Sequence, residues 1–390
     1  MTNVTRQELL GRARELVPEL RARAEKAEID RRKPEETNRA FHEAGFYKVF
    51  RPKRFGGYEM DFSILFELCA EIGRGCGSSA WILANVAGHD KVNGMRDPRA
   101  QDEIWGPDPD TLSCACFPTK DSRVRRVDGG VVLDGLWNFA SGVDQASWND
   151  FNIFLPRDGA PPEHVFALVP KSDYRVIDDW FVTGLAATGS RAVAVSDYFV
   201  PEYRLLSSEL CRGGPTPGSA VNPGALYKAP VWALGGKMFL GPLLGIARGA
   251  LDIMVEDLGP RRSVTGATLS EQPTVQVRVA EADAEIEAAA ALALSDARIA
   301  EEYAARAERP PERERVRWRH NDAFAASLCL RAVERLHALA GARRLSSSDP
   351  FQRAFRDAHA AAAQITIAWD LQAVNYGRVM FGMRPGDPRI

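Results

Sequence analysis

The sequence predicts a mainly α-helical protein with a small β-domain in its middle. Three observations lead to this fold class. Apolar residues recur at helical spacing up to about residue 110, the pattern becomes strand-like after it, and helical spacing returns near the C-terminal end. A chain of 390 residues with 45% hydrophobic content can bury more than one core. We therefore expect an N-terminal helical domain over 1–110, a β-domain over 111–208 and a helical bundle with its preceding linker over 209–390.

The N-terminal region is predicted to contain several helices. Apolar residues follow helical spacing over 9–20 and again over 62–69. Pro34, Pro52 and the pair Gly56-Gly57 interrupt this pattern and separate the helices. The polar, charged start of the chain differs from a signal peptide, which favours a cytoplasmic protein.

The middle region alternates in the way typical of strands. Residues 124–135 predict a hairpin about a Gly129-Gly130 turn. Further strand candidates lie at 151–155, 164–169 and 192–195. Cys114 and Cys116 would share one face of a strand, which suits packing better than metal binding. We therefore expect no metal site.

The C-terminal region is predicted to be an antiparallel bundle. A linker rich in Gly and Pro covers 209–230, and an Ala-rich stretch over 274–307 predicts one long helix. The apolar window 231–255 is interrupted by Lys237 and Pro242, so it predicts a buried helix pair rather than a membrane span.

Three glycines in this region recur every four residues. Gly241, Gly245 and Gly249 would lie on one face of a helix. A row of residues without side chains lets a second helix approach closely, which favours helix packing over cofactor contact.

Charge excludes one class of partner. Lys and Arg together number 50 and Asp and Glu 52, so no basic surplus points to nucleic acid.

Small hydroxyl residues gather around glycines before the last strand of the β-domain. Thr183, Gly184, Thr188, Gly189 and Ser190 form this segment. Glycines beside short polar side chains let backbone N–H groups approach a planar or anionic ligand closely. An ordinary Gly-rich turn has the same composition. The segment stands near the start of the bundle, and pockets favour such domain junctions.

Seven stretches, in this order and spacing, resemble the acyl-CoA dehydrogenase superfamily and, more closely, its two-component flavin-dependent monooxygenases. They lie at 51–57, 78–89, 117–119, 137–142, 183–191, 241–248 and 346–357. The resemblance implies a β-barrel-like middle domain, a C-terminal four-helix bundle and a homotetramer. It also implies reduced flavin, as FMNH2 or FADH2, delivered by a separate NAD(P)H-dependent reductase. O2 would react with it to give a flavin hydroperoxide that hydroxylates an aromatic or polycyclic small molecule.

The resemblance also assigns site residues. Trp137, Ser141, Thr188 and Ser190 would face the flavin ring, with Ser141 bonded to N5 or its hydroperoxide. Ser141 could instead cap its own turn. Arg191 could lie near the polar edge of the flavin or be a solvated charge at the end of a strand.

The phosphate end is assigned in the same way. Arg262, or its neighbour Arg261, would meet the flavin phosphate, and a helix start near Ser347 would present N–H groups to it. A surface arginine pair and an ordinary N-cap are the alternatives.

Two residues are expected on the substrate side. His89 could position or deprotonate a phenol, or be a buried structural histidine. Gln364 stands where many related aromatic hydroxylases carry a histidine, and an amide cannot act as a base. His359 lies five residues earlier, so on a helix it would face elsewhere. Either His89 supplies the base, or the substrate is already nucleophilic, as an amine for N-oxygenation would be.

Two rival functions are kept. An acyl-CoA dehydrogenase would need a carboxylate base, and Glu256 is the remaining candidate because residues 335–390 contain no Glu. A non-catalytic flavin-binding or partner-binding scaffold is the other.

Overall fold

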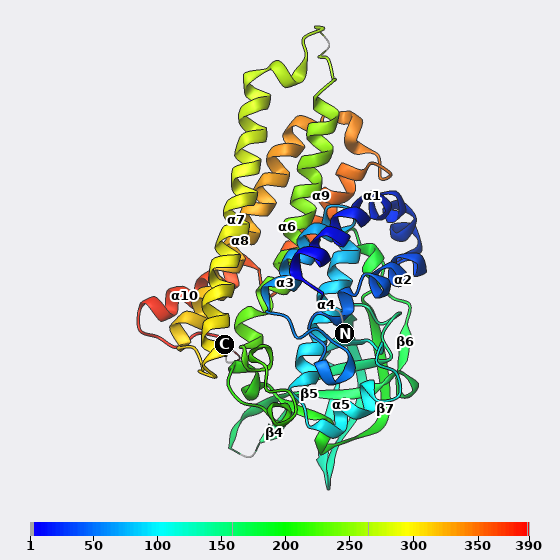
Figure 1. Cartoon of the computed structure of the whole chain (residues 1–390), viewed down its shortest axis with the longest axis vertical. Helices are drawn as coiled ribbons and strands as arrows, with labels where there is room; N and C mark the ends of the chain where they lie inside the picture. The colour runs from blue at the N-terminus through cyan, green and yellow to red at the C-terminus, as the bar shows by residue number, and fades with distance from the viewer. Residues whose placement is uncertain (1–3, 158, 264, 388, 390) are drawn as a thin grey trace.

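The computed structural model describes residues 4–157, 159–263, 265–387 and 389. The first three residues of the predicted N-terminal domain lie outside this part. The molecule is elongated, with a tall helical bundle at one end and a β-sheet at the other (Figure 1). N-terminal helices lie against the side of the bundle and above the sheet. This arrangement confirms the predicted order of helices, β-domain and bundle.

The N-terminal helices are α1 (Arg6–Asp30), α2 (Glu35–Glu43), α3 (Ser63–Gly73), α4 (Gly77–Gly94) and α5 (Pro98–Trp105). Thr5 caps α1 through a capping box with Glu8, and Asp97 caps α5 by accepting the N–H of Arg99. Pro34 immediately precedes α2, in agreement with its predicted role as a breaker. Every residue of α4 is buried, so this helix forms the centre of the molecule.

The strands are β1 (Ser113–Pro118), β2 (Arg123–Val127), β3 (Gly130–Ala140), β4 (Trp148–Arg157), β5 (Ala160–Pro170), β6 (Arg175–Ile177), β7 (Arg191–Pro201) and β8 (Leu205–Ser207). Their order in the sheet is β6-β7-β3-β1-β4-β5-β8, and β2 pairs with β3. The pairing of β1 with β4 is parallel. The predicted hairpin is confirmed, but its turn lies one residue earlier than expected, at Asp128-Gly129, because Gly130 already pairs with Val127 as the first residue of β3.

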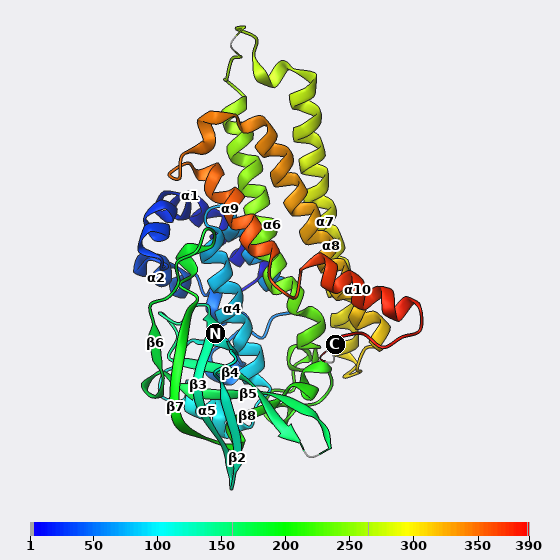
Figure 2. The ribbon, with the colours of Figure 1, turned by 180° about the vertical axis from the view of Figure 1, so that it is seen from behind.

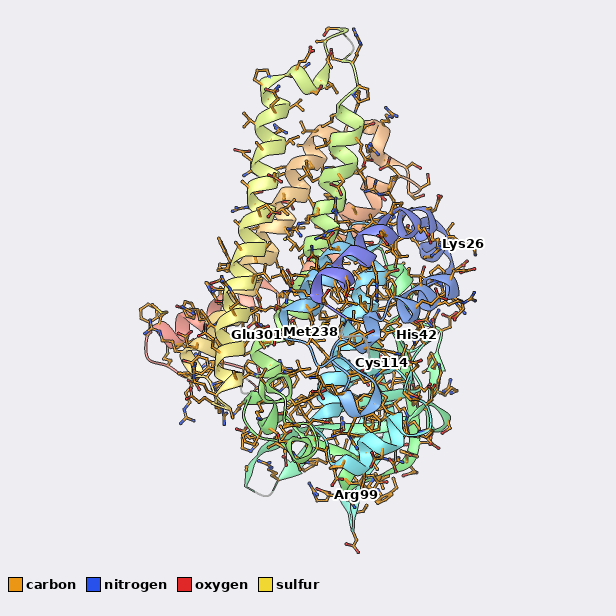
Figure 3. The ribbon with its side chains drawn as sticks, in the orientation of Figure 1. Lys26, His42, Arg99, Cys114, Met238 and Glu301 are labelled. Atoms are coloured by element: carbon orange, nitrogen blue, oxygen red, sulfur yellow. The ribbon has the colours of Figure 1, made fainter. Side chains whose placement is uncertain are left out.

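The β-domain has its own hydrophobic core. Cys114 and Cys116 are fully buried in it, together with Trp137 and Phe151. The ring of Trp137 lies edge-on to that of Phe151, with centroids 5.0 Å apart. The packing role predicted for the two cysteines is therefore confirmed. Figure 3 shows Cys114 near the middle of the molecule, close to where the sheet meets the helices.

The bundle consists of α6 (Val231–Leu258), α7 (Pro273–Ala305), α8 (Glu312–Ala340) and α9 (Pro350–Ala362). A further helix, α10 (Trp369–Met380), packs beside α8 at the end nearer the sheet (Figure 2). The single long helix predicted from the Ala-rich stretch is confirmed as α7.

The predicted helix pair over 231–255 is wrong, because α6 runs through it without a break. Pro242 lies inside this helix and is buried against α3. Lys237, the charge taken as an interruption, is buried and bonded to Asp322 of α8 at 2.6 Å. By length and composition α6 could cross a membrane, and 61% of its apolar window is buried inside the molecule.

The glycine row of α6 packs against α3. A Cβ on Gly245 would lie 2.5 Å from the carbonyl oxygen of Ala70, and one on Gly241 would lie 2.8 Å from that of Phe66. Gly249 meets the carbonyl of Arg74 in the same way. The two helices therefore touch backbone to backbone, as the four-residue spacing predicts.

Candidate active site

Three side-chain hydroxyls form a continuous row at the edge of the β-domain. Ser141 lies just after β3, and Thr188 and Ser190 lie in the loop before β7. The oxygens of Ser141 and Ser190 are 2.7 Å apart, and Ser190 donates to Thr188 at 2.8 Å. Thr188 in turn donates to the carbonyl oxygen of Leu185 at 2.7 Å. All three hydroxyl residues are buried. The structure thus brings Ser141, from the stretch 137–142, next to Thr188 and Ser190, from the stretch 183–191.

The backbone of the loop is set by two left-handed residues. Leu185 has φ of 53° and Gly189 has φ of 54°, on either side of the short helical turn Ala186–Thr188. The positive φ of Gly189 favours glycine there, and a Cβ would also crowd the guanidinium of Arg191 at 2.9 Å and the carbonyl oxygen of Arg31 at 3.1 Å.

The loop is joined to the C-terminal bundle. The N–H of Leu185 donates to the carboxylate of Asp357, on α9, at 2.6 Å. Gly184 lies directly against the backbone of Arg356, where a side chain would not fit. Burial raises the pKa of Asp357 to about 6, although the bond from Leu185 acts in the opposite direction.

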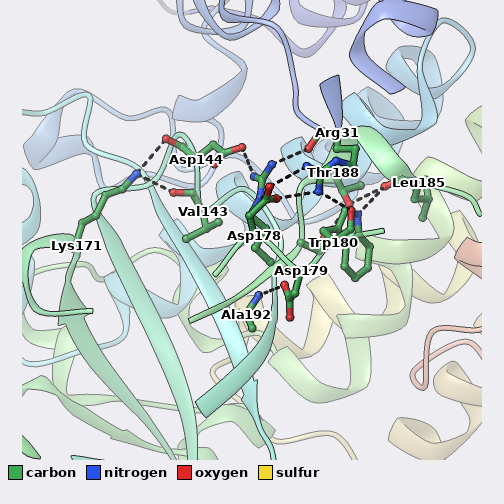
Figure 4. A network of polar contacts seen from close by, with 12 residues as sticks. Arg31, Val143, Asp144, Lys171, Asp178, Asp179, Trp180, Leu185, Thr188 and Ala192 are labelled. Atoms are coloured by element: carbon green, nitrogen blue, oxygen red, sulfur yellow. Dashed lines mark hydrogen bonds and ion pairs between the residues drawn. The ribbon is translucent and has the colours of Figure 1, made fainter. Parts of the chain in front are cut away.

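Ion pairs hold the loop on its other side (Figure 4). Arg191 is buried and contacts Asp144 at 2.7 Å and Asp178 at 3.0 Å. Arg31, at the end of α1, also pairs with Asp178 at 2.8 Å. Bonds from Arg31 and Arg191 hold the pKa of Asp178 well below its ordinary value. The burial and ion pairs of Arg191 contradict the solvated charge considered for it, and its place near the polar edge of the flavin stays a prediction.

An exposed aromatic face adjoins the hydroxyl row. Phe139 has positive φ and is 56% exposed, although it stands only two residues before Ser141. Its ring lies edge-on to that of Trp180, with centroids 6.1 Å apart. We call Phe139, Trp180 and Phe181 the aromatic face. An exposed ring beside a row of hydroxyls is compatible with a planar ligand that has a polar edge.

Trp137, selected for this position from the sequence, points the other way. It has no exposed surface, and its indole N–H donates to the carbonyl of Asn152 at 2.9 Å. The pairing of β3 with β7 shifts register between Trp137 and Ala140, which turns Phe139 outward. The side chain of Trp137 is part of the β-core, so we leave it out of the site.

His89 lies on the face of α4 that packs against the Ser141 turn. A Cβ on Gly142 would lie 2.7 Å from Val86 and 3.4 Å from Ile82, and His89 follows Ile82 by two helical turns. Its Nδ1 lies 2.6 Å from the carbonyl oxygen of Asn85, so Nδ1 carries the proton and Nε2 bears the lone pair. Burial lowers the pKa of His89, which keeps the ring neutral at pH 7.

Gln364 lies just beyond the C-terminal end of α9. Its Oε1 accepts the backbone N–H of Thr366 at 2.6 Å and also accepts the Thr366 hydroxyl. Because α9 ends at Ala362, the helical angle used to compare His359 with Gln364 does not apply. The ring of His359 instead contacts the carbonyl of Phe355 at 2.8 Å and Glu334 at 3.4 Å.

Arg262 and Ser347, the two residues predicted to contact the flavin phosphate, both lie in exposed loops of the C-terminal bundle and not in the β-domain. Arg262 is exposed in the loop between α6 and α7, at the end of the bundle far from the sheet (Figure 1). Ser347 is exposed before α9, where Asp349 is the N-cap and accepts the N–H groups of Phe351 and Gln352. The helix start is thus an ordinary N-cap, which leaves Ser347 outside the cap.

Sequence reasoning missed Phe139, Leu185 and Asp357. In a regular strand Trp137 and Phe139, two residues apart, would share one face, and the register shift between Trp137 and Ala140 turns Phe139 to the opposite side. The bond between Leu185 and Asp357 joins residues 172 apart in sequence, which no local pattern reports. The signal available for Asp357 was its place beside Arg356 in one of the family-like stretches.

Two family models match this chain and define its fold class. The acyl-CoA dehydrogenase N-terminal domain covers residues 5–90, and the acyl-CoA dehydrogenase C-terminal domain covers residues 238–369. The crystal structure of 3-HSA hydroxylase from Rhodococcus sp. RHA1 shares this fold, with a TM-score of 0.93 and 32% identity. The superposition covers 98% of this chain and 99% of that one.

Curated relatives narrow the class. HsaA, the oxygenase subunit of a flavin-dependent monooxygenase from Mycobacterium tuberculosis (strain CDC 1551 / Oshkosh), is 34% identical over 98% of each chain. The oxygenase component of an FADH2-dependent resorcinol hydroxylase from Rhizobium sp. (strain MTP-10005) is 33% identical, over 97% of this chain and 95% of its own. The chain belongs to the oxygenase components of flavin-dependent monooxygenases. It is an enzyme that uses reduced flavin and O2.

The residues at the site fit this cofactor. The isoalloxazine ring of flavin is planar and largely apolar, and its central edge carries one nitrogen, N5. The exposed ring of Phe139 offers a surface for the plane, and Ser141 beside it offers a hydroxyl oxygen for the edge. The cofactor, when bound, supplies the electrons that activate O2.

Proposed function

We propose that this monooxygenase hydroxylates a phenolic or polycyclic aromatic small molecule beside the hydroxyl row. The observation that carries the proposal is the row Ser141–Ser190–Thr188 next to the exposed ring of Phe139. The flavin ring would lie on the aromatic face, with N5 at Ser141. The substrate would then enter between the flavin and α4, on the side where His89 stands.

His89 would serve as the base for a phenol. Its Nε2 bears the lone pair because Nδ1 donates to Asn85, and the lowered pKa keeps it unprotonated at neutral pH. Accepting the proton of the phenol makes the aromatic ring more electron-rich, which favours attack on an electrophilic oxygen. Gln364 would orient the substrate by hydrogen bonding, since an amide cannot take up the proton.

The phosphate end of the flavin would be held by a second copy of the chain. The guanidinium of Arg262 is exposed and contacts the carbonyl of Gly266 at 3.3 Å, so it can turn toward an anion. The loop between α6 and α7, which carries Arg262, lies at the end of the bundle opposite the β-domain (Figure 1). We infer a homotetramer in which Arg262 of one subunit serves the flavin of another.

A separate reductase would deliver the reduced flavin. The names of the relatives describe them as an oxygenase subunit and an oxygenase component, which fits a two-component system. We propose a cytoplasmic location, because a reductase that oxidises NAD(P)H would find this electron donor in the cytoplasm.

The dehydrogenase alternative depends on Glu256 as the base. Glu256 lies on the surface of α6, where both of its oxygens contact Arg21 at 3.3 Å. A base for carbon acids works in a water-excluded site, so this paired surface carboxylate does not favour the alternative. The amine substrate remains the second candidate, because Gln364 provides no base at its position.

The test uses purified protein and chemically reduced flavin without oxygen. FAD and FMN are titrated separately, and each complex is then mixed with isotopically labelled O2 and resorcinol or a larger phenol. Incorporation of one labelled oxygen atom into the aromatic product supports the proposal. Bleaching of bound oxidised FAD by an acyl-CoA, without any labelled product, would overturn it in favour of a dehydrogenase.

A further inference from the structure

The hydrogens of the hydroxyl row can point in only one direction. A carbonyl oxygen accepts and cannot donate, so Thr188 must give its hydrogen to Leu185. Ser190 must then donate to Thr188, because the Thr188 hydrogen is already used. Ser141 must therefore donate to Ser190, 2.7 Å away. The oxygen of Ser141 is left with lone pairs and no hydrogen for a ligand.

The carbonyl that fixes this direction is itself held in place. The indole N–H of Trp180 also donates to the Leu185 oxygen, at 3.4 Å. The N–H of Leu185 is held by Asp357 at 2.6 Å, from the other side of the residue. Leu185 adopts a left-handed backbone conformation, which occurs in neither β-strands nor right-handed helices. The anchor of the row is thus held by Trp180 of its own loop, by Asp357 of α9 and by the left-handed backbone of Leu185 itself.

We propose that this row makes the site select the reduced form of flavin, and that Thr188 and Ser190 are the positioning residues for that selection. The inference rests on the proposed placement of flavin N5 at Ser141. Reduced flavin carries a hydrogen on N5, which Ser141 can accept. Oxidised flavin has a lone pair on N5, which faces the lone pairs of Ser141 and finds no donor.

The selection has a consequence for the reaction cycle. The oxygenase must take reduced flavin from its reductase partner and release oxidised flavin after each turnover. A site that donates to N5 would hold the oxidised product and block the next cycle. An acceptor at N5 weakens the complex with the product, while the complex with the reduced cofactor is unaffected.

The experiment measures two dissociation constants for the full-length protein. Oxidised and chemically reduced FAD are each titrated without oxygen, and the ratio of the two constants is the readout. In Thr188→Val the Ser190 hydrogen loses its acceptor and can turn to Ser141, which frees the Ser141 hydrogen for the ligand. The ratio of oxidised to reduced dissociation constants should fall about tenfold, the value of one hydrogen bond.

Matched variants separate direction from packing. Thr188→Ser keeps the hydroxyl and should restore the wild-type ratio, and Thr183→Val, at an exposed position of the same segment, should leave the ratio unchanged. In a Ser141→Ala background, Thr188→Val should have no further effect on the ratio, because the group it directs is gone. A purely structural role for Thr188 would affect both backgrounds equally.

The outcomes distinguish this inference from the proposed function. A Thr188→Val ratio within twofold of wild type, with both flavins still bound, overturns the role of the row and leaves the monooxygenase proposal standing. An effect of Thr188→Val that persists in the Ser141→Ala background also overturns it. Failure of the wild-type protein to bind reduced flavin contradicts the proposed site itself.

Discussion

The carboxylate of Asp357 on α9 accepts the backbone N–H of Leu185 at 2.6 Å, across a domain boundary. This bond connects the C-terminal bundle to the loop that carries two of the three aligned hydroxyls. The carboxylate is buried and lies near Glu28, which disfavours its ionised form. The position of the loop therefore depends on a group whose charge is costly to bury.

Asp357→Asn should change how stability depends on pH. The pKa of Asp357 rises from 3.8 to about 6 on folding, so the folded state binds its proton more tightly than the unfolded chain. The stability it contributes is present below about pH 4 and is lost as pH rises through 6. The difference in unfolding free energy between the wild type and Asp357→Asn should therefore fall by about 1–3 kcal/mol as the pH rises from 4 to 7. Urea unfolding at several pH values checks this, and a constant difference would contradict it.

Gly245→Ala should destabilise the fold by separating α3 from α6. The new methyl group would lie 2.5 Å from the carbonyl oxygen of Ala70, so the helices must move apart. Overpacking of this kind costs about 1–3 kcal/mol. The matched control is Gly235→Ala on the same helix, where a Cβ meets nothing within 4 Å. This substitution should stabilise the protein, because alanine favours the helix more than glycine does. Urea unfolding of both variants measures the contrast, and equal stabilities would show that the close approach is unimportant.

Phe139→Ala should weaken flavin binding and leave folding stability almost unchanged. The ring is half exposed and would stack on the isoalloxazine, a contact that contributes about 1 kcal/mol, or roughly fivefold in the dissociation constant. Phe199→Ala, an exposed phenylalanine that pairs near the hairpin end of β3, is the control. Anaerobic titration with reduced FAD compares the two. Equal dissociation constants for the two variants would place the flavin elsewhere.

Much of the fold follows from local pattern. The long helix α7 and the hairpin of β2 and β3 were predictable because their periodicity is carried by neighbouring residues. The break predicted within α6 was wrong because Pro242 costs a hydrogen bond that burial against α3 compensates. Periodicity does not report compensation by another helix.

The site was predictable by residue type and not by geometry. Ser141, Thr188 and Ser190 could be selected because small hydroxyls beside glycines are suited to ligand contact. Their alignment depends on the left-handed Leu185, whose conformation no sequence rule for leucine predicts. The sequence analysis placed Trp137 at the site, whereas Phe139 faces outward there. The cause is similar, since one irregular pairing of β3 with β7 changes which side chain faces outward.

Arg262→Ala should weaken binding of reduced flavin without affecting the fold. A lost charged hydrogen bond to phosphate costs about 1–3 kcal/mol. The effect should be absent for riboflavin, which has no phosphate, and present for FMN and FAD. Light scattering of the same samples tests the assembly, because a monomer at micromolar concentration would contradict the inferred tetramer. Unchanged FMN affinity in an intact tetramer would place the phosphate away from Arg262.

His89 and Gln364 should affect different features of the hydroxylation of a phenol. His89→Asn removes the base, so the pH profile of kcat/KM should lose one ionisation. In the wild type this ionisation lies below the ordinary histidine pKa of 6.5, because burial lowers the pKa of His89. Above that pKa the wild-type ring is neutral and active, and below it the rate of the wild type should fall.

Gln364→Ala should instead keep the shape of the pH profile and raise the release of hydrogen peroxide, because the substrate is held less firmly beside the flavin. Oxygen consumption compared with product formed measures this uncoupling, and the pH profile is recorded on the same samples. A His89→Asn variant with full coupled hydroxylation and an unchanged profile would favour a substrate that needs no base, such as an amine. A lost ionisation in Gln364→Ala would show that the amide positions the base rather than the substrate.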